Sequence, residues 1–183
     1  EPILWWSPDP RLVLFPAELH VSRRLAKTLR RSQLTITYDQ AFSGVIRACA
    51  SPRGRRPEDA GTWLNGDMIA AYEALADYGY AHSVEAWDPE GRLVGGLYGL
   101  ALGRAFFGES MFTRASDASK VAFVTFVRDL AAHGFQLVDC QVYSDHLASF
   151  GAREIPRRDF LLELDRAVAA GEPAGPWRGA AVS

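Results

Sequence analysis

The sequence predicts an α/β domain of the α+β type. Three observations predict this class. Stretches with the alternation of strands and stretches with the 3.6-residue period of helices follow one another along the chain. The chain has 183 residues, most simply one domain, and is 48% hydrophobic and 23% charged, which is usual for a globular protein. No uninterrupted apolar run approaches the ~20 residues of a membrane span.

The first predicted helix covers residues 23–31 and follows a short apolar run over 12–15. Ser22 stands immediately before it, where a hydroxyl can accept a hydrogen bond from a free amide of the first turn. Five cations recur at helical spacing, so we expect one basic face, with Leu25 and Leu29 turned toward the protein. The five cations are Arg23, Arg24, Lys27, Arg30 and Arg31.

An alternating run over residues 34–38 predicts a strand, and Asp39 is predicted to cap the short helix that follows. The inward side of that helix is expected to comprise Phe42, Val45, Ile46 and Cys49. Residues 51–61 form a predicted loop with a second basic cluster, made of Arg53, Arg55 and Arg56.

A helix over residues 66–78 is predicted from the spacing of its apolar side chains, and Gly79 is expected to end it. Two strands follow over 82–87 and 92–100. They are joined by residues 88–91, Asp-Pro-Glu-Gly, a sequence that suits a type I turn.

The remaining predicted elements alternate between strands and helices. They are an extended segment over 104–112, a long helix over 116–132, a strand over 135–143, one or two helical turns over 144–150 and a helix over 157–169. From Gly171 the chain is rich in Gly, Ala and Pro, which predicts one domain over 1–170 and a loose tail over 171–183.

The net charge of −2 hides an asymmetry. Residues 1–60 hold ten Lys and Arg against six Asp and Glu, whereas residues 61–183 hold ten against sixteen. The basic helix face has two interpretations that the pattern leaves open. It is either a solvated surface, or a footprint for a nucleic-acid backbone in which charge positions the ligand without reading bases.

Several common chemistries are disfavoured. The sequence contains no G-x-x-x-x-G-K-[ST], G-x-G-x-x-G, H-E-x-x-H, C-x-x-C or G-x-S-x-G motif. Its four histidines are scattered, so we expect no metal and no cofactor. Cys49 and Cys140 lie in apolar segments and are interpreted as reduced thiols of a cytoplasmic protein.

Polar side chains interrupt two otherwise apolar segments. Glu109 follows the apolar pair 106–107, and Asp139 and Gln141 lie two positions apart in a predicted strand, hence on one face. A carboxylate in a core-like strand is unfavourable unless it is hydrogen-bonded or functional. Asp139 is therefore a candidate catalytic residue, with a buried structural acceptor as the alternative. Glu109 is a second candidate, with a solvated strand end as the alternative.

Short strings that occur in one order along nearly the whole chain identify a family. They are Trp5-Trp-Ser-Pro-Asp-Pro-Arg11, Gly61-Thr-Trp63, His82-Ser-Val-Glu85, Phe107-Gly-Glu-Ser-Met-Phe112, Ala118-Ser-Lys120, Asp139-Cys-Gln141, His146-Leu-Ala-Ser-Phe-Gly-Ala152 and Ile155-Pro-Arg-Arg-Asp-Phe160. Together they make the chain similar to the bacterial leucyl/phenylalanyl-tRNA–protein transferase family.

The resemblance implies a GNAT-like acyltransferase fold, in which a mixed sheet is flanked by helices. It also implies transfer of Leu or Phe from aminoacyl-tRNA to the α-amino group of proteins that begin with Arg or Lys, which marks them for N-end-rule degradation. The expected partners are Leu-tRNA, Phe-tRNA and such proteins. In this hypothesis Gln141 touches the reaction centre, Asp139 orients it or accepts the proton, and Glu109 holds the acceptor.

The resemblance further implies binding residues. The Leu/Phe pocket falls on Leu97, Phe106, Met111, Phe123, Phe126 and Val138, with an adaptable Met among aromatics and some acceptance of methionine as donor. For Phe123 and Phe126, helical spacing alone favours core packing instead. Strict alternation turns Val138 away from its polar neighbours. Trp63 and Tyr72 are expected near the terminal adenosine, with core packing as the alternative for Tyr72. The basic helix face is expected on the tRNA backbone.

Family members usually carry several tens of residues before the Trp5-Trp6 segment, so we expect an N-terminal region to be missing. Two other functions stay open. One is an acetyl-CoA-dependent N-acetyltransferase of the same fold, although the sequence lacks the [QR]-x-x-G-x-[GA] turn that would cradle a pyrophosphate. The other is a non-catalytic module that binds degrons or RNA, which the polar residues Glu109, Asp139 and Gln141 disfavour.

Overall fold

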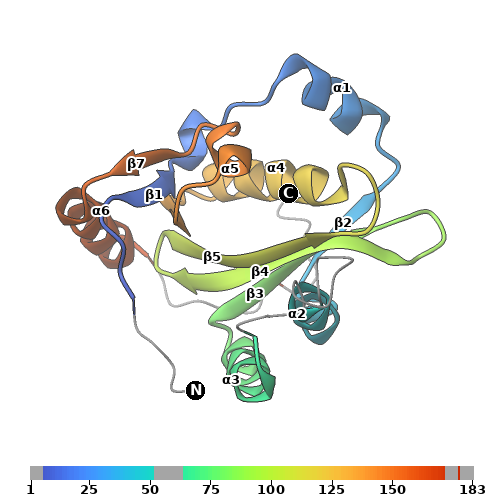
Figure 1. The fold of residues 1–183 in the computed structure, drawn as a ribbon, viewed down its shortest axis with the longest axis horizontal. Helices are drawn as coiled ribbons and strands as arrows, with labels where there is room; N and C mark the ends of the chain where they lie inside the picture. The colour runs from blue at the N-terminus through green and yellow to red at the C-terminus, as the bar shows by residue number, and fades with distance from the viewer. Residues whose placement is uncertain (1–5, 52–63, 172–176, 178–183) are drawn as a thin grey trace, which may run out of the picture.

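The computed structural model describes residues 6–51, 64–171 and 177. Its centre is a seven-stranded sheet with the order β2-β3-β4-β5-β6-β1-β7 (Figure 1). β5 and β6 are parallel, and every other neighbouring pair is antiparallel. The predicted α/β class is therefore confirmed, as is the mixed sheet flanked by helices.

Most elements follow the predicted bounds. The strands are β1 (Arg11–Leu14), β2 (Thr35–Tyr38), β3 (Ala81–Trp87), β4 (Leu93–Leu102), β5 (Ala105–Thr113), β6 (Leu137–Gln141) and β7 (Arg153–Ile155). The helices are the 3-10 turn η1 (Pro16–Glu18), α1 (Arg23–Arg31), α2 (Phe42–Ala50), α3 (Gly66–Asp77), α4 (Ala118–Ala132), α5 (Asp145–Ala148) and α6 (Arg157–Ala169). The sequence patterns do not predict β7 or η1.

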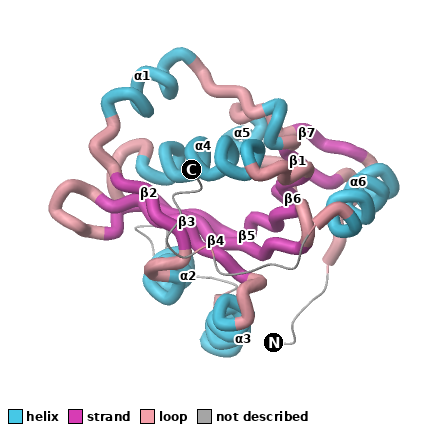
Figure 2. Tube along the Cα trace, turned by 180° about the vertical axis from the view of Figure 1, so that it is seen from behind, coloured by secondary structure: helices cyan, strands magenta, loops and turns pink. Residues whose placement is uncertain are grey.

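Helices cover both faces of the sheet (Figures 1 and 2). α4 lies along one face, with α1 and α5 on the same side, and α2 and α3 lie on the other. α6 packs against β1, β5 and β6 near one end of the sheet. The largest apolar cluster lies between α4 and the sheet, and a second lies under α2 and α3. The central strands β3 and β4 are therefore buried on both faces.

The local signals that begin and end elements act as predicted at three positions. Ser22 Oγ accepts from the backbone N–H of Leu25 at 3.3 Å, which caps α1. Gly79, with φ of 77°, follows the end of α3. The backbone N–H of Gly91 donates to the carbonyl of Asp88 at 2.9 Å and closes the predicted turn between β3 and β4.

The prediction that Asp39 caps α2 is wrong. The helix begins at Phe42, and its N-cap Ala41 makes no side-chain bond. Asp39 lies one residue after β2 with φ of 53°, and its carboxylate turns back to the sheet. There Oδ1 accepts from the backbone N–H of Ser83 at 2.9 Å, and Oδ2 lies 2.9 Å from Nδ1 of His82. Asp39 stands too far before the helix to reach its first free amides.

The segment predicted as a loose tail over 171–183 contains one docked residue. The aromatic ring of Trp177 packs into the cluster under α4, in contact with the side chains of Tyr38, His82, Phe106, Phe126 and Phe135. Composition alone does not predict this, because a single large apolar side chain can dock whatever its neighbours are. Residues 172–176 and 178–183 lie outside the described residues.

Candidate active site

The candidate site lies where two parallel strands part. β5 and β6 pair only over three positions, the last of which joins Phe107 to Asp139. Beyond this point β5 continues to Thr113, whereas β6 ends at Gln141. A cavity of about 250 Å³ opens there, lined by both strands and by residues of α4 and α5. It brings Glu109, Asp139 and Gln141 together, so the three predicted catalytic residues share one cavity.

Irregular pairing re-aims the polar side chains. Along β4 and β5 the pairing passes from Tyr98 with Ser110 to Gly99 with Gly108, so that Glu109 has no partner across the ladder. Along β1 and β6 it passes from Val13 with Asp139 to Leu12 with Gln141, which leaves Cys140 as the extra residue. Each extra residue forms a β-bulge in its strand, and a β-bulge changes the direction in which the neighbouring side chains point.

The second bulge lies between Val138 and Gln141 and changes the alternation between them. Strict alternation would separate Val138 from Asp139 and Gln141, yet all three line the same cavity, together with Cys140. Gln141 also departs from strand geometry, with φ of 66°. The end of β6 therefore follows the wall of the cavity, because its backbone bends at the bulge.

Asp139 is the centre of a buried ion pair that the sequence patterns do not predict. Its side chain is fully buried, and Arg11 from β1 binds it with two bonds, Nε to Oδ1 at 3.0 Å and Nη2 to Oδ2 at 2.6 Å. Oδ1 also accepts from the backbone N–H of Gln141 at 2.9 Å. Both oxygens are thus engaged, and a bidentate guanidinium holds the carboxylate in one orientation.

Glu109 lines the cavity, and its carboxylate differs from that of Asp139. Among the described residues no cationic side chain forms a salt bridge with it. It accepts hydrogen bonds from the Tyr72 hydroxyl and from the Gln141 side chain. Burial raises the pKa of Glu109 above its ordinary value of 4.5, and these two hydrogen bonds lower it only in part. Burial next to Glu109 also raises the pKa of Tyr72, which keeps that hydroxyl a donor.

The apolar part of the cavity contains five of the six predicted pocket residues. They are Leu97, Phe106, Met111, Phe123 and Val138. Phe126 does not line it: this residue is 1% exposed and packs behind Phe106, with ring centroids 4.7 Å apart. Helical spacing places Phe123 and Phe126 on one face of α4 but does not say which of them reaches the surface of a cavity.

Of the two residues expected near an adenosine, the structure describes Tyr72 but not Trp63. Trp63 lies outside the described residues, as do Arg53, Arg55 and Arg56. Tyr72 lies on α3 with its side chain buried, and its ring packs edge-on against that of Tyr98, with centroids 5.2 Å apart. Tyr98 and His146 also line the cavity, although the patterns do not single them out. Burial lowers the pKa of His146 below 6.5, so its imidazole is neutral at neutral pH.

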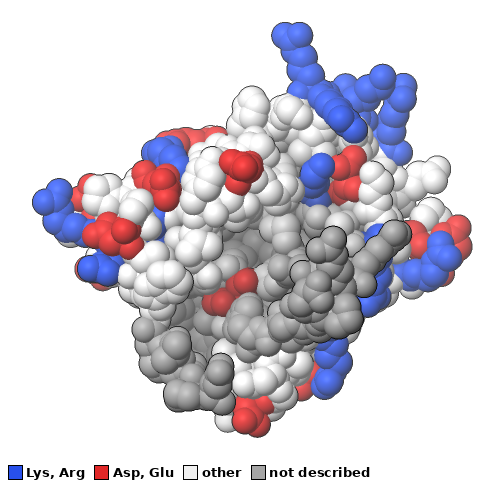
Figure 3. All heavy atoms as spheres, in the orientation of Figure 1, with Lys and Arg blue, Asp and Glu red and all other residues white. Residues whose placement is uncertain are grey.

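The predicted basic face of α1 is present. Arg23, Arg24, Lys27, Arg30 and Arg31 all reach solvent, whereas Leu25 is buried against the protein. Figure 3 shows Lys and Arg side chains projecting into solvent over α1. Among the described residues none of these five cations forms a salt bridge. The face is therefore available to an external anion.

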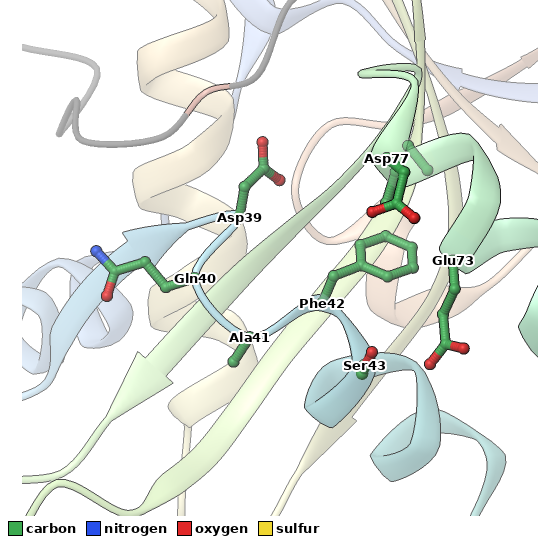
Figure 4. A pocket seen from close by; sticks show the side chains of 9 residues that line it. Asp39, Gln40, Ala41, Phe42, Ser43, Glu73 and Asp77 are labelled. Atoms are coloured by element: carbon green, nitrogen blue, oxygen red, sulfur yellow. The ribbon is translucent and has the colours of Figure 1, made fainter.

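A second cavity, of about 420 Å³, lies between the β2–α2 turn and α3 (Figure 4). Three carboxylates border it, from Asp39, Glu73 and Asp77. Two of them already have partners within the chain, since Asp39 binds Ser83 and Glu73 lies 3.0 Å from Arg47. No residue predicted for catalysis or donor binding borders it, so the cavity between β5 and β6 is the better candidate site.

Comparison with known proteins identifies the family. A family model described as Leucyl/phenylalanyl-tRNA protein transferase matches residues 13–165. The chain belongs to this family. The leucyl/phenylalanyl-tRNA–protein transferase of Pseudomonas syringae pv. syringae (strain B728a) is 60% identical over 166 residues, which are 91% of this chain and 71% of that one. That of Nitrosospira multiformis is 56% identical over 177 residues, 97% of this chain and 75% of that one.

The structure of L-PGS from Bacillus licheniformis is similar in fold, with a TM-score of 0.51 at 11% identity over 79% of this chain and 51% of that one. Within the leucyl/phenylalanyl-tRNA–protein transferase match lie Glu109, Asp139 and Gln141, whereas Arg11 and Trp177 lie outside it. In the described part of the chain no helix is long and apolar enough to cross a membrane. Nor does any group of three or more metal-ligating side chains gather there.

Proposed function

We propose that this protein transfers Leu or Phe, with some acceptance of Met, from aminoacyl-tRNA to the α-amino group of proteins that begin with Arg or Lys. The observation that carries the proposal is one cavity with an apolar wall and a polar end, in a chain of the leucyl/phenylalanyl-tRNA–protein transferase family. In this proposal the new residue marks the acceptor for N-end-rule degradation. Because charged tRNA is the donor, the activity belongs to the cytoplasm.

The donor side chain would occupy the apolar part of the cavity. Phe106 and Phe123 offer aromatic walls, and Met111, whose thioether side chain adapts its shape, suits both an aliphatic and an aromatic guest. A pocket of this kind discriminates by about 1–3 kcal/mol per methylene. Incomplete exclusion of methionine follows from that limit.

The reaction is the aminolysis of an ester. The acceptor nitrogen attacks the carbonyl carbon, the bond from that carbon to the adenosine 3′ oxygen breaks, and a proton passes from the amine to the leaving oxygen. An α-amino group has a pKa of about 7.7–8.0, so roughly a tenth of it is already neutral at pH 7. The enzyme therefore needs to align the groups and stabilise the tetrahedral intermediate more than it needs a strong base.

The contacts support a division of these roles. The ion pair with Arg11 supports Asp139 as an orienting group rather than a proton acceptor, because both of its oxygens already accept hydrogen bonds. Asp139 fixes the backbone of Gln141, whose amide we place at the reaction centre. Glu109, which is half-buried and bound to Gln141 and Tyr72, is suited to hold the acceptor amine or its cationic side chain.

The solvent-facing cations of α1 support binding of the tRNA backbone. In this proposal they neutralise phosphates without reading sequence, and Trp63 and Tyr72 lie near the terminal adenosine. We also propose that residues 1–170 form a single GNAT-like domain. The single mixed sheet with helices on both faces supports this assignment.

One assay separates this function from its alternatives. The full chain is mixed with radiolabelled Leu-tRNA and a peptide that begins with Arg, and the reaction is repeated with labelled acetyl-CoA. Label that reaches the peptide only from the tRNA supports the proposal. Label from acetyl-CoA alone would make the protein an N-acetyltransferase, and label from neither donor would favour a binding module.

A further inference from the structure

Trp177 ties the segment beyond α6 to the core. Its indole stacks on the buried imidazole of His82, with ring centroids 3.7 Å apart and planes inclined by 8°. Its backbone N–H donates to Oδ2 of Asp39 at 3.0 Å. Two separate attachments therefore fix one residue that lies twelve positions beyond the end of the family match at residue 165.

The same indole packs behind the wall of the apolar cavity. Its centroid lies 5.8 Å from that of Phe126 and 6.2 Å from that of Phe106. Phe106 and Phe126 are themselves 4.7 Å apart. Phe106 lines the cavity, whereas Trp177 does not. Phe106 therefore connects the surface that meets a donor side chain with the indole behind it.

Close packing of Trp177 against Phe106 and Phe126 restricts the movement of both phenylalanine rings. Protein interiors leave few voids larger than a water molecule, so Phe106 has no space into which to retreat while the indole is seated. A smaller side chain at 177 would leave an empty volume beside Phe106 and Phe126. Movement of either ring into that volume deepens the cavity, which favours a longer donor side chain over a shorter one.

We propose that Trp177 is a positioning residue for donor selection, which sets the depth of the apolar cavity by holding Phe106 and Phe126 in place. It thereby sets the relative rates at which Leu and Phe are transferred. This inference rests on the proposed function.

The test measures kcat/KM for Leu-tRNA and for Phe-tRNA with one Arg-first peptide, in the full chain and in two variants. Trp177→Ala should raise the ratio of kcat/KM for Phe-tRNA to kcat/KM for Leu-tRNA about threefold or more. One methylene in an apolar pocket changes kcat/KM about tenfold or more, so even a partial deepening of the cavity should give a change of this size. Trp177→Phe keeps a ring behind the wall and should give a ratio between those of Trp177→Ala and the unaltered chain.

Ile46→Ala is the matched control. Ile46 is fully buried, but it belongs to the cluster under α2 and α3. Its loss should lower the Tm without changing the ratio, which separates donor selection from a general loss of stability. If Trp177→Ala does not fold, Trp177→Leu replaces it in the same comparison.

An unchanged ratio in a folded Trp177 variant overturns the inference, and so does an equal change in Ile46→Ala. If the unaltered chain transfers neither amino acid, the proposed function fails and the inference falls with it. An active unaltered chain with an unmoved ratio overturns the role of Trp177 alone.

Discussion

Replacing Arg11 with Met tests how the site is held together. The substitution removes both guanidinium bonds to Asp139. Among the residues that the structure describes, it leaves that fully buried carboxylate with the backbone N–H of Gln141 as its one donor. Removing one partner of a buried ion pair leaves an uncompensated charge, which lowers stability by about 3–5 kcal/mol. The Arg11 side chain is 11% exposed, so water can reach part of the vacated space. We therefore expect a loss near the lower end of that range, about 3 kcal/mol.

Urea denaturation of four proteins measures this loss. They are the unaltered chain, Arg11→Met, Asp139→Asn and the double variant. Asp139→Asn removes the buried negative charge, so the double variant should lose clearly less stability than the two single losses added together. A loss below about 1 kcal/mol for Arg11→Met would match an ordinary exposed pair and refute the reasoning, as would simple additivity in the double variant.

Four further predictions concern the reaction, its substrates and the stability of the site. Asp139→Ala and Gln141→Ala should each reduce transfer by about 10²-fold while tRNA binding, measured by filter retention, stays near normal; normal turnover by either variant contradicts the assignment. Because burial raises the pKa of Glu109, kcat/KM should fall as the pH decreases through a value above 4.5, and Glu109→Gln should abolish that limb of the profile. The same raised pKa means that native Glu109 holds its proton more tightly than the unfolded chain does, so stability is lost as pH rises through the native pKa. Glu109→Gln should therefore gain stability relative to the unaltered chain as the pH rises from 4.5 through the native pKa, and a urea midpoint difference that does not grow with pH contradicts it. Replacing the five cations of α1 with Gln should weaken tRNA binding and flatten its salt dependence, by about one unit of slope for each phosphate that the helix no longer neutralises. An unchanged slope contradicts a role of this face in tRNA binding.

Much of the fold follows from patterns within single elements. The period of the apolar residues predicts α6 over 157–169, and the cap Ser22 and the turn after β3 act as their residue types indicate. These signals are local, because each depends on neighbours a few residues away. The sequence singles out Glu109, Asp139 and Gln141 for the same reason, since polar side chains in apolar strands are unusual wherever they occur.

The features that local patterns miss depend on contacts between distant residues. Arg11 and Asp139 are 128 positions apart, and nothing in either segment indicates that β1 lies beside β6. The bulges at Glu109 and Cys140 follow from how neighbouring strands pair, and alternation within one strand does not reveal them. Phe126 and Asp39 show the same limit. The family resemblance suggests a pocket wall for Phe126, and the residue type suggests a helix cap for Asp39, but tertiary packing gives each a different partner.

The measurement that tests the central claim most directly is mass-spectrometric sequencing of an Arg-first peptide after incubation with the protein and Leu-tRNA. The proposal predicts that one Leu precedes the Arg and is joined to its former α-amino group, and that Gln141→Ala gives little or none of this product. A peptide that stays unmodified in the presence of Leu-tRNA and Phe-tRNA, or one that is acetylated from acetyl-CoA instead, would contradict it.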